Sequence, residues 1–417
     1  MSENSSSRQV LSVIDPYAMK SQPFHRREFI RFMAASPLAA YAFAQDSTPL
    51  ITRAKDALSA MDFEPIAHKA LPPAHWGYLS GGVDDDLTVR MNREAFAHFQ
   101  LRARRLVDAT TTDLKTDVFG ATWDMPIYVS AVGSQLAFHP DGELATARAA
   151  KAQKTMQMLS TVSSKSVEDV AKALGTPPWY QLYMPTNWSD TEKMVQRVEA
   201  AGCPVLVWTI DLLAGRNAET TSRLARQDTR DCMSCHITPP IGGSAVIRNR
   251  ARPMFAGLSG EMNPPAADWT YVDRLKKMTK MKLVLKGIDT AEDAKLAMEH
   301  GADGVIVSNH GGRATETGRG TIDILPAVVD VLRSRIPVFV DGGFRRGSDI
   351  YKALAIGARA VGIGRPYIYG LSSFGPEGVE RVLEILRAEL TLTMRQCGTP
   401  SIAKITRAAV LRQGVPL

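Results

Sequence analysis

The 417-residue sequence predicts an α/β fold, a (β/α)8 TIM barrel with an N-terminal helical extension. Three observations predict it. Eight short, largely apolar runs that are typical of β-strands follow one another after residue 120. Amphipathic helical segments separate most of these runs. Polar residues that can carry chemistry stand where the runs end, as they do at the active-site end of such barrels.

The elements follow in chain order. Residues 50–105 have helical periodicity and a glycine-rich turn at Ser80-Gly81-Gly82, which predicts the helical extension. The eight strands are expected at Ile127–Ala131, Met156–Leu159, Tyr180–Tyr183, Val205–Ile210, Leu283–Leu285, Gly304–Val307, Val338–Val340 and Ala360–Ile363. The clearest helices between them are expected at Glu143–Ala152, Ser166–Leu174, Ala291–His300 and Ser348–Ala355.

Six of the eight predicted strands end in polar, charged or glycine residues. In strand order these are Gln181 and Tyr183, Thr209 and Asp211, Lys286, then Ser308, His310 and Arg313, Asp341, and last Gly364 and Arg365. Burying such polar side chains in a packed barrel interior would be costly. We therefore expect them to meet at the mouth of the barrel and to form a site.

Composition bounds the class of protein. Hydrophobic residues make up 45% of the chain and charged residues 22%, which is typical of an ordinary globular enzyme. The net charge of +7 is mild for this length and is spread along the chain, so nucleic acid is not an expected partner.

Residues 1–44 are interpreted as an export signal. Arg26-Arg27 precede a modest apolar stretch, and Ala42-Phe43-Ala44 follows as a cleavage site with small residues at its ends. This pattern resembles a twin-arginine signal, so we expect a mature periplasmic protein that starts near residue 45. An amphipathic helix that caps the barrel is the alternative. The apolar stretch is too short and too interrupted to span a membrane.

The segment Ser308–Arg313 sets an imidazole and a guanidinium three residues apart, on a loop with two glycines. A neutral His310 can accept a proton near pH 7, and Arg313 can hold a carboxylate through two parallel hydrogen bonds. Together they describe a site for a 2-hydroxy acid. A histidine in a loop beside a surface arginine is the plainer alternative.

This segment resembles the hallmark of the FMN-dependent 2-hydroxy-acid dehydrogenases and oxidases, the family of glycolate oxidase and flavocytochrome lactate dehydrogenase. Two glycine-rich loops, Asp341–Gly347 and Gly362–Pro366, resemble the phosphate-binding loops of FMN barrels. The resemblance implies oxidation of a 2-hydroxy acid to the 2-oxo acid with FMN as cofactor. It also implies a homo-oligomer, since relatives are commonly tetramers.

The resemblance assigns roles to matching residues. His310 would be the base, Asp211 would orient it, Arg313 would bind the substrate carboxylate, and Tyr78 and Tyr183 would bind substrate. For the tyrosines, packing in the core is the alternative. The residues expected to contact FMN are Gly133, Ser160, Gln181, Thr209, Lys286, Ser308, Asp341, Gly342, Gly343, Arg345, Gly364 and Arg365.

The sequence departs from the family pattern at two places. Ala131-Val132-Gly133 stands where relatives more often have Pro-Thr-Ala, which we expect to alter access to the flavin. The run that starts at Asp211 is one residue shorter than in relatives and lacks their proline. Arg216 is therefore our candidate for the second carboxylate-binding arginine.

Cys232-Met233-Ser234-Cys235-His236 has the Cys-x-x-Cys-His spacing of c-type haem attachment. Both thiols would bond the haem, and His236 would ligate its iron. Flavocytochrome relatives use a separate haem domain, which this chain lacks. A disulfide between Cys232 and Cys235 is the alternative, and half of a zinc site is weaker, since no second Cys-x-x-Cys pair exists.

The motif lies in residues 212–268, the long connection between the fourth and fifth strands that covers the active-site mouth in this family. We therefore predict a periplasmic dehydrogenase, with residues 45–417 as its barrel. It would pass electrons from FMN through haem c to cytochrome c or another respiratory acceptor. A haem-free oxidase that makes hydrogen peroxide is one alternative, and a non-catalytic barrel for binding or electron relay is another.

Overall fold

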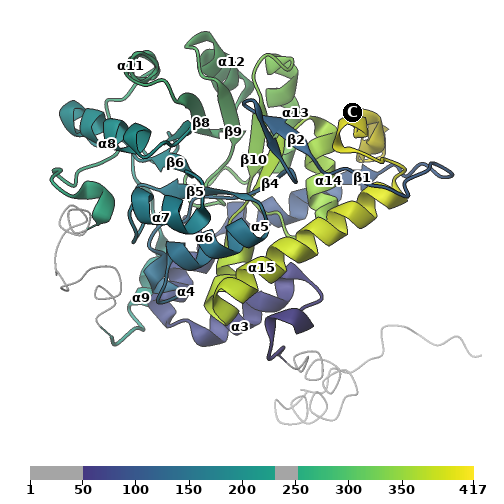
Figure 1. The fold of residues 1–417 in the computed structure, drawn as a ribbon, viewed down its shortest axis with the longest axis horizontal. Helices are drawn as coiled ribbons and strands as arrows, with labels where there is room; N and C mark the ends of the chain where they lie inside the picture. The colour runs from purple at the N-terminus through teal and green to yellow at the C-terminus, as the bar shows by residue number, and fades with distance from the viewer. Residues whose placement is uncertain (1–49, 231–251) are drawn as a thin grey trace, which may run out of the picture. The chain divides into compact units, whose positions relative to one another are not determined.

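The computed structural model describes residues 50–230 and 252–417, and its centre is a closed barrel of eight parallel strands (Figure 1). In chain order the strands are β4 (Ile127–Val129), β5 (Met156–Ser160), β6 (Trp179–Leu182), β7 (Val205–Thr209), β8 (Lys282–Ile288), β9 (Gly304–Val307), β10 (Val338–Asp341) and β11 (Ala360–Ile363). Each pairs with the next, and β11 closes the barrel on β4 with Val361 opposite Ile127.

The predicted barrel is confirmed, and all eight expected runs are strands with ends shifted by a few residues at most. The largest difference is β8, which extends beyond Lys286 to Ile288 through an irregularity in its pairing with β9. Gly287 lies in this irregularity with φ +108°, where side chains are strained.

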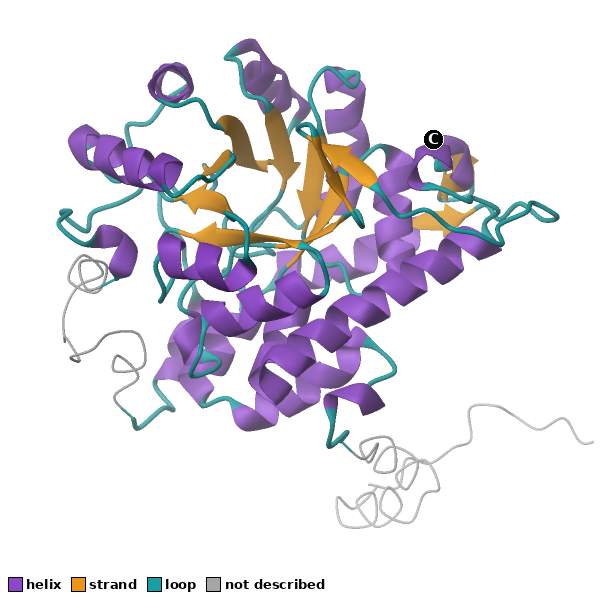
Figure 2. Ribbon diagram, in the orientation of Figure 1, coloured by secondary structure: helices purple, strands orange, loops and turns teal. Residues whose placement is uncertain are grey.

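Helices surround the strands (Figure 2). They are α6 (Glu143–Ala152), α7 (Val167–Leu174), α8 (Trp188–Ala200), α9 (Glu219–Ala225), α11 (Thr270–Met278), α12 (Ala291–Glu299), α13 (Thr321–Leu332), α14 (Gly347–Ile356) and α15 (Arg365–Gln396). Several of these helices begin at a capping side chain. The hydroxyls of Ser166 and Thr290, for example, accept hydrogen bonds from the backbone N–H groups of Asp169 and Asp293. The four helices expected from the sequence are α6, α7, α12 and α14.

Short helices precede the barrel, as predicted. They are η1 (Ala54–Asp56), η2 (Ala60–Phe63), α3 (Glu64–Ala70), α4 (Pro73–Ser80), α5 (Leu87–Glu94) and η3 (Ala95–His98). The predicted Ser80-Gly81-Gly82 turn ends α4, which brings Tyr78 towards the carboxyl ends of the barrel strands.

The sequence did not predict two small antiparallel sheets. One pairs β1 (Phe99–Leu101), β12 (Val410–Arg412) and β13 (Val415–Pro416), and the other is the hairpin β2 (Thr116–Val118) and β3 (Ala121–Trp123). Val118, Phe119 and Trp123 of the hairpin pack with Trp179 and Phe339 inside the barrel. This apolar cluster fills part of the barrel interior, while the carboxyl ends of the strands carry polar groups.

Among the described residues, no helix combines the length and the apolar character that crossing a membrane requires. No group of three His, Cys, Asp or Glu side chains within the described ranges is placed to hold a metal ion. The predicted export signal (residues 1–44) and the predicted haem residues Cys232, Cys235 and His236 lie outside the described residues.

Candidate functional site

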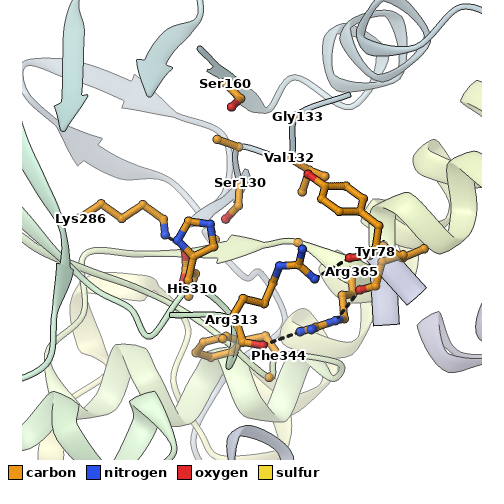
Figure 3. A pocket seen from close by; sticks show the side chains of 18 of the residues that line it. Tyr78, Ser130, Val132, Gly133, Ser160, Lys286, His310, Arg313, Phe344 and Arg365 are labelled. Carbon is orange, nitrogen blue, oxygen red and sulfur yellow. Dashed lines mark hydrogen bonds and ion pairs between the residues drawn. The ribbon is translucent and has the colours of Figure 1, made fainter. Parts of the chain in front are cut away.

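A cavity of about 860 Å³, its open mouth included, lies at the carboxyl ends of the barrel strands. Thirteen of the predicted site residues line it: Tyr78, Gly133, Ser160, Tyr183, Lys286, His310, Arg313, Asp341, Gly342, Gly343, Arg345, Gly364 and Arg365. Figure 3 shows Lys286 and His310 to the left of the cavity, Tyr78 to its right and Arg313 between them. Residues from distant parts of the chain therefore converge as the barrel prediction required.

His310 is held between two partners. Its Nδ1 lies 3.0 Å from Asp211 Oδ1, and its Nε2 lies 3.1 Å from the Tyr183 hydroxyl. An ionised carboxylate can only accept hydrogen bonds, so Nδ1 carries the hydrogen and donates it to Asp211. In the neutral ring, Nε2 then accepts a hydrogen bond from the Tyr183 hydroxyl. His310 has φ +58° and its N–H donates to Ser308 Oγ, which turns the ring back over the strand end. Nε2 is thus the atom that can take a proton in the cavity.

Burial lowers the pKa of His310 from its ordinary value, while the charge of Asp211 raises it and Lys286 lowers it. Burial acts to raise the pKa of Asp211, but His310 and Lys286 outweigh it and the pKa of Asp211 is lowered overall. At neutral pH the pair is therefore a neutral imidazole beside a carboxylate, which is the state a general base requires.

This electrostatic arrangement predicts the pH dependence of activity. Protonation of His310 removes the base, so kcat/KM should fall as pH drops through its pKa, below the ordinary value of 6.5. Asp211→Asn removes the charge that raises this pKa, so the fall should move to still lower pH while the plateau decreases. A pH profile of both proteins checks this. A midpoint above 6.5 in the wild type, or an upward shift in the variant, would contradict the assignment.

Arg313 lies across the cavity beside Tyr78. Its Nη1 donates to the backbone carbonyls of Tyr78 and Gly81, and its Cζ lies 4.9 Å from the centre of the Tyr78 ring. Both hydrogen bonds that Arg313 donates to described residues come from Nη1. The N–H groups of Nε and Nη2 can therefore bind an anion. Burial, and then the charge of Arg216, lower the pKa of Arg313, so an anionic ligand would stabilise this partly buried cation.

Arg216 is close to this group but does not line the cavity. Its side chain is exposed, and its Nη1 lies 3.4 Å from the Arg313 carbonyl. Its charge reaches the site, because it acts on the pKa of Tyr183, His310 and Arg313. The structure therefore brings Arg216 to the rim, and its role as a second carboxylate-binding residue stays a prediction.

Lys286 belongs to a buried charged network. Its Nζ donates to Ser308 Oγ at 2.9 Å and lies 3.6 Å from Asp341 Oδ2, while Ser308 Oγ donates to Asp341 Oδ1 at 2.5 Å. Lys286 is only 4% exposed, so its charge acts in surroundings of low dielectric constant. Lys286 lines the cavity, where it can stabilise negative charge on a bound group.

Several buried polar atoms fit the ring of a flavin. Gln181 Nε2, Thr209 Oγ1 and Ser130 Oγ are buried with no hydrogen-bond partner in the described structure. Such atoms are costly unless a ligand or water satisfies them. Ser160 Oγ donates to Gln181 Oε1 at 2.9 Å, which turns the amide so that its nitrogen remains available. An isoalloxazine ring, with carbonyls and ring nitrogens along one edge, supplies matching groups.

The glycine-rich loops fit a phosphate. Gly342 and Gly343 have φ of +103° and +82°, and a Cβ on Gly343 would overlap the Asn92 carbonyl. Arg345 is buried, burial lowers its pKa, and its Nη1 donates to the Phe344 carbonyl at 3.0 Å. A phosphate beside these loops would supply the negative charge that the buried Arg345 requires.

Arg365 is placed differently from Arg345. It lines the cavity, but its guanidinium donates to the carbonyls of Leu79, Ser80, Gly81 and Gly311. These bonds join the end of α4, and hence Tyr78, to the loop that carries His310. The predicted contact of Arg365 with the phosphate stays a prediction, while the structure gives this residue a bridging role between two parts of the site.

Eight residues that line the cavity were not predicted as site residues: Leu79, Ser130, Ala131, Val132, Val162, Gly311, Phe344 and Gly362. Ser130 directly follows β4, so the strand-end rule that singled out the other residues could have found it. Gly133 and Val162 are closely matched, because a Cβ on Gly133 would lie 2.5 Å from Val162 Cγ2. The sequence predicted Gly133 as a site residue, but it gave no sign of the close partner Val162.

Comparisons with known proteins agree with this geometry. Residues 67–412 match the family described as FMN-dependent dehydrogenase. The chain is 38% identical over 362 residues to a peroxisomal (S)-2-hydroxy-acid oxidase of Oryza sativa subsp. japonica, covering 86% of this chain and 96% of that one. It is 36% identical over 352 residues to an L-lactate dehydrogenase (cytochrome) of Wickerhamomyces anomalus, covering 83% of this chain but 60% of that one.

Solved structures are similar as well. A doubly substituted flavocytochrome b2 with pyruvate bound has a TM-score of 0.76 and 33% identity, covering 90% of this chain and 91% of that chain. A mandelate oxidase variant with 2-hydroxy-phenylacetamide has a TM-score of 0.73 and 32% identity, covering 84% of this chain and 97% of that chain.

Proposed function

This chain belongs to the FMN-dependent dehydrogenase family, and we propose that it is a periplasmic dehydrogenase that oxidises a 2-hydroxy acid to the 2-oxo acid. We propose further that the electrons leave through a covalently bound haem c to cytochrome c or another respiratory acceptor. The observation that carries the chemistry is His310, held between Asp211 and Tyr183 with its Nε2 in the cavity that Arg313 also lines.

Each residue of the site has a distinct role in the proposed oxidation. Arg313 and Tyr78 bind and orient the substrate carboxylate. His310 Nε2 takes one proton from the substrate, and Asp211 stabilises the imidazolium that results. Lys286 holds positive charge beside the cofactor, and Arg345 with the Gly342-Gly343 turn would hold the phosphate. FMN, when bound, supplies the two-electron acceptor that the oxidation requires.

The carboxylate-binding role can be tested by substitution. Arg313→Lys keeps the charge but loses the planar fork, so both the apparent affinity for substrate and the rate should fall, by about tenfold or more. Arg216→Ala should act in the same direction if the rim arginine is a second carboxylate-binding residue. Steady-state kinetics measure both variants. If Arg216→Ala behaves as the wild type while Arg313→Lys is impaired, the proposed role of Arg216 is wrong.

The proposal of haem c is supported by the Cys232–His236 motif and by the two-arginine segment near the N-terminus, since haem attachment of this kind needs export. The described residues on either side of the motif add support. Before it, Asp228 Oδ2 accepts the backbone N–H of Ala74 in α4 at 3.2 Å. After it, Arg252 contacts Ser134 and Val162, beside the cavity. The chain thus rejoins the described structure beside the cavity, at Arg252.

A second candidate function is a 2-hydroxy-acid oxidase that returns electrons to oxygen and forms hydrogen peroxide. The similarity to a peroxisomal (S)-2-hydroxy-acid oxidase favours it. Oxygen consumption and cytochrome c reduction, measured side by side with one substrate, separate the two. Fast cytochrome reduction with slow peroxide formation supports the dehydrogenase, and the reverse supports the oxidase.

Two lesser proposals concern location and assembly. Twin-arginine export is tested by changing Arg26 and Arg27 to lysine, which should retain the protein in the cytoplasm. A homo-oligomer is expected from the resemblance and is tested by light scattering. Cytoplasmic retention of the unchanged chain in a host with the export system would contradict the first proposal.

A further inference from the structure

Two loops form the side of the cavity that includes Gly133. The loop after β4 contributes Val132 and Gly133, and the loop after β5 contributes Val162. They are joined directly, because the Ser134 N–H donates to the Val162 carbonyl at 3.0 Å. The close approach of Gly133 to Val162 means that a small shift of either loop changes the surface that faces a bound flavin.

Arg252 joins the same two loops from a third part of the chain. It precedes η5 (Pro253–Phe255) in the connection between β7 and β8. One Nη atom donates to the Val162 carbonyl, and the other donates to Ser134 Oγ at 2.8 Å. The Val162 carbonyl therefore accepts from both Ser134 and Arg252. Such a bond from a charged donor is stronger than a neutral one.

Glu143 joins the loops through their amides. It is fully buried, and its Oε1 accepts the backbone N–H of Gln135 at 3.1 Å and that of Ser164 at 2.9 Å. Burial raises the pKa of Glu143, while these two bonds and the charge of Arg252 oppose that rise. The Glu143 carboxyl on the amides and the Arg252 guanidinium on the carbonyl thus secure one junction, and the charge of Arg252 favours the ionised form of Glu143.

This junction connects to atoms that fit the flavin ring. The Val162 N–H donates to Ser160 Oγ at 3.3 Å, and Ser160 Oγ donates to Gln181 Oε1. Gln181 Nε2 is one of the buried atoms with no partner in the described structure. A continuous set of hydrogen bonds therefore runs from Arg252 through Val162 and Ser160 to the amide that we assign to the ring.

We infer that Arg252 is a positioning residue of the flavin site. It acts through Val162 and Ser134 to set the loop of Gly133 and the orientation of Gln181, and it is not among the residues that line the cavity. Through Arg252, the start of η5 supports the loops that carry Gly133 and Val162. The inference rests on the proposed function only in taking FMN as the occupant of the cavity.

The test compares Arg252→Met with a matched variant, Arg197→Met. Arg197 lies on α8 and donates to the carbonyl of Pro253, so it holds the same η5 turn but contacts no residue of the cavity. FMN affinity is measured by quenching of flavin fluorescence on titration of apoprotein, and flavin reduction by anaerobic stopped flow. Arg252→Met should weaken FMN binding and slow reduction, each by about tenfold, with substrate affinity nearly unchanged.

Two further variants make the test independent of stability. Arg252→Lys keeps the charge and should restore much of the FMN affinity, and Ser134→Ala should cause a smaller loss in the same direction. Arg197→Met should leave FMN affinity and reduction as in the wild type, whatever it does to the melting temperature. Equal losses in Arg197→Met and Arg252→Met, or wild-type FMN affinity in Arg252→Met, would overturn the inference. FMN affinity needs no substrate, so failure of the wild type to oxidise 2-hydroxy acids would count against the proposed function alone.

Discussion

Replacing His310 by alanine is expected to lower the rate constant of flavin reduction by about a hundredfold or more, the usual scale for a lost general base. The Nε2 atom faces the cavity and is the neutral acceptor of the site, since Nδ1 is bound to Asp211. Without the imidazole, the oxidation has no positioned proton acceptor. The variant should still bind FMN, because the network of Lys286, Ser308 and Asp341 does not use the His310 ring.

The chain offers a matched control for this experiment. His300 also pairs through Nδ1 with a carboxylate, Asp273, at 3.0 Å, but this pair lies outside the cavity. His300→Ala should therefore reduce its flavin at the rate of the wild type. Anaerobic stopped-flow reduction with a saturating 2-hydroxy acid measures both variants. Near-normal reduction in His310→Ala would remove His310 from the mechanism and leave the cavity without its proposed base.

Replacing both Cys232 and Cys235 by serine is expected to abolish covalent haem and most of the turnover with a cytochrome acceptor. In the wild type, exported in a host with haem-attachment machinery, haem should remain on the polypeptide after denaturing electrophoresis. The double variant should still let substrate bleach its flavin, because every residue that we assign to the flavin lies outside the motif. The loss should therefore appear in electron delivery and not in substrate oxidation.

The alternative for Cys232 and Cys235 is a disulfide, and a count of free thiols distinguishes it from attached haem. The other two cysteines, Cys203 and Cys397, are buried free thiols, and burial raises the pKa of both. Thiol counting on denatured protein then separates the two accounts, because a disulfide returns two additional thiols after reduction and haem thioethers do not. Haem-free wild-type protein from a competent host would contradict the haem proposal.

The barrel was predictable because its strands are buried on both faces and are therefore short, apolar and separated by amphipathic helices. The cost of burying polar side chains also predicted many of the residues that line the cavity. Polar residues at strand ends, such as Lys286, His310 and Asp341, are too costly to bury in the barrel interior, so they gather at one end. Once the strands were located, the convergence of these residues followed from topology alone.

Other features depend on contacts between distant segments that leave no local signal. Arg252 gives no sign in its own segment that it will bind the Val162 carbonyl across the structure. Arg365 matched a phosphate-binding motif, but its guanidinium also meets the carbonyls at the end of α4. The break at Phe374 and Gly375 within α15 was likewise not anticipated.

The anaerobic visible spectrum of the purified protein, recorded during titration with (S)-2-hydroxy acids, tests the central claim most directly. We expect flavin absorption that bleaches as the acid is added, with the 2-oxo acid as product and an end point of about one acid per flavin in protein that carries no haem. Each attached haem accepts one further electron, so the end point of haem-bearing protein should rise to about three acids per two flavins, and the reduced haem bands should develop during the titration. A protein that binds FMN but whose flavin no 2-hydroxy acid of the series reduces would contradict the account.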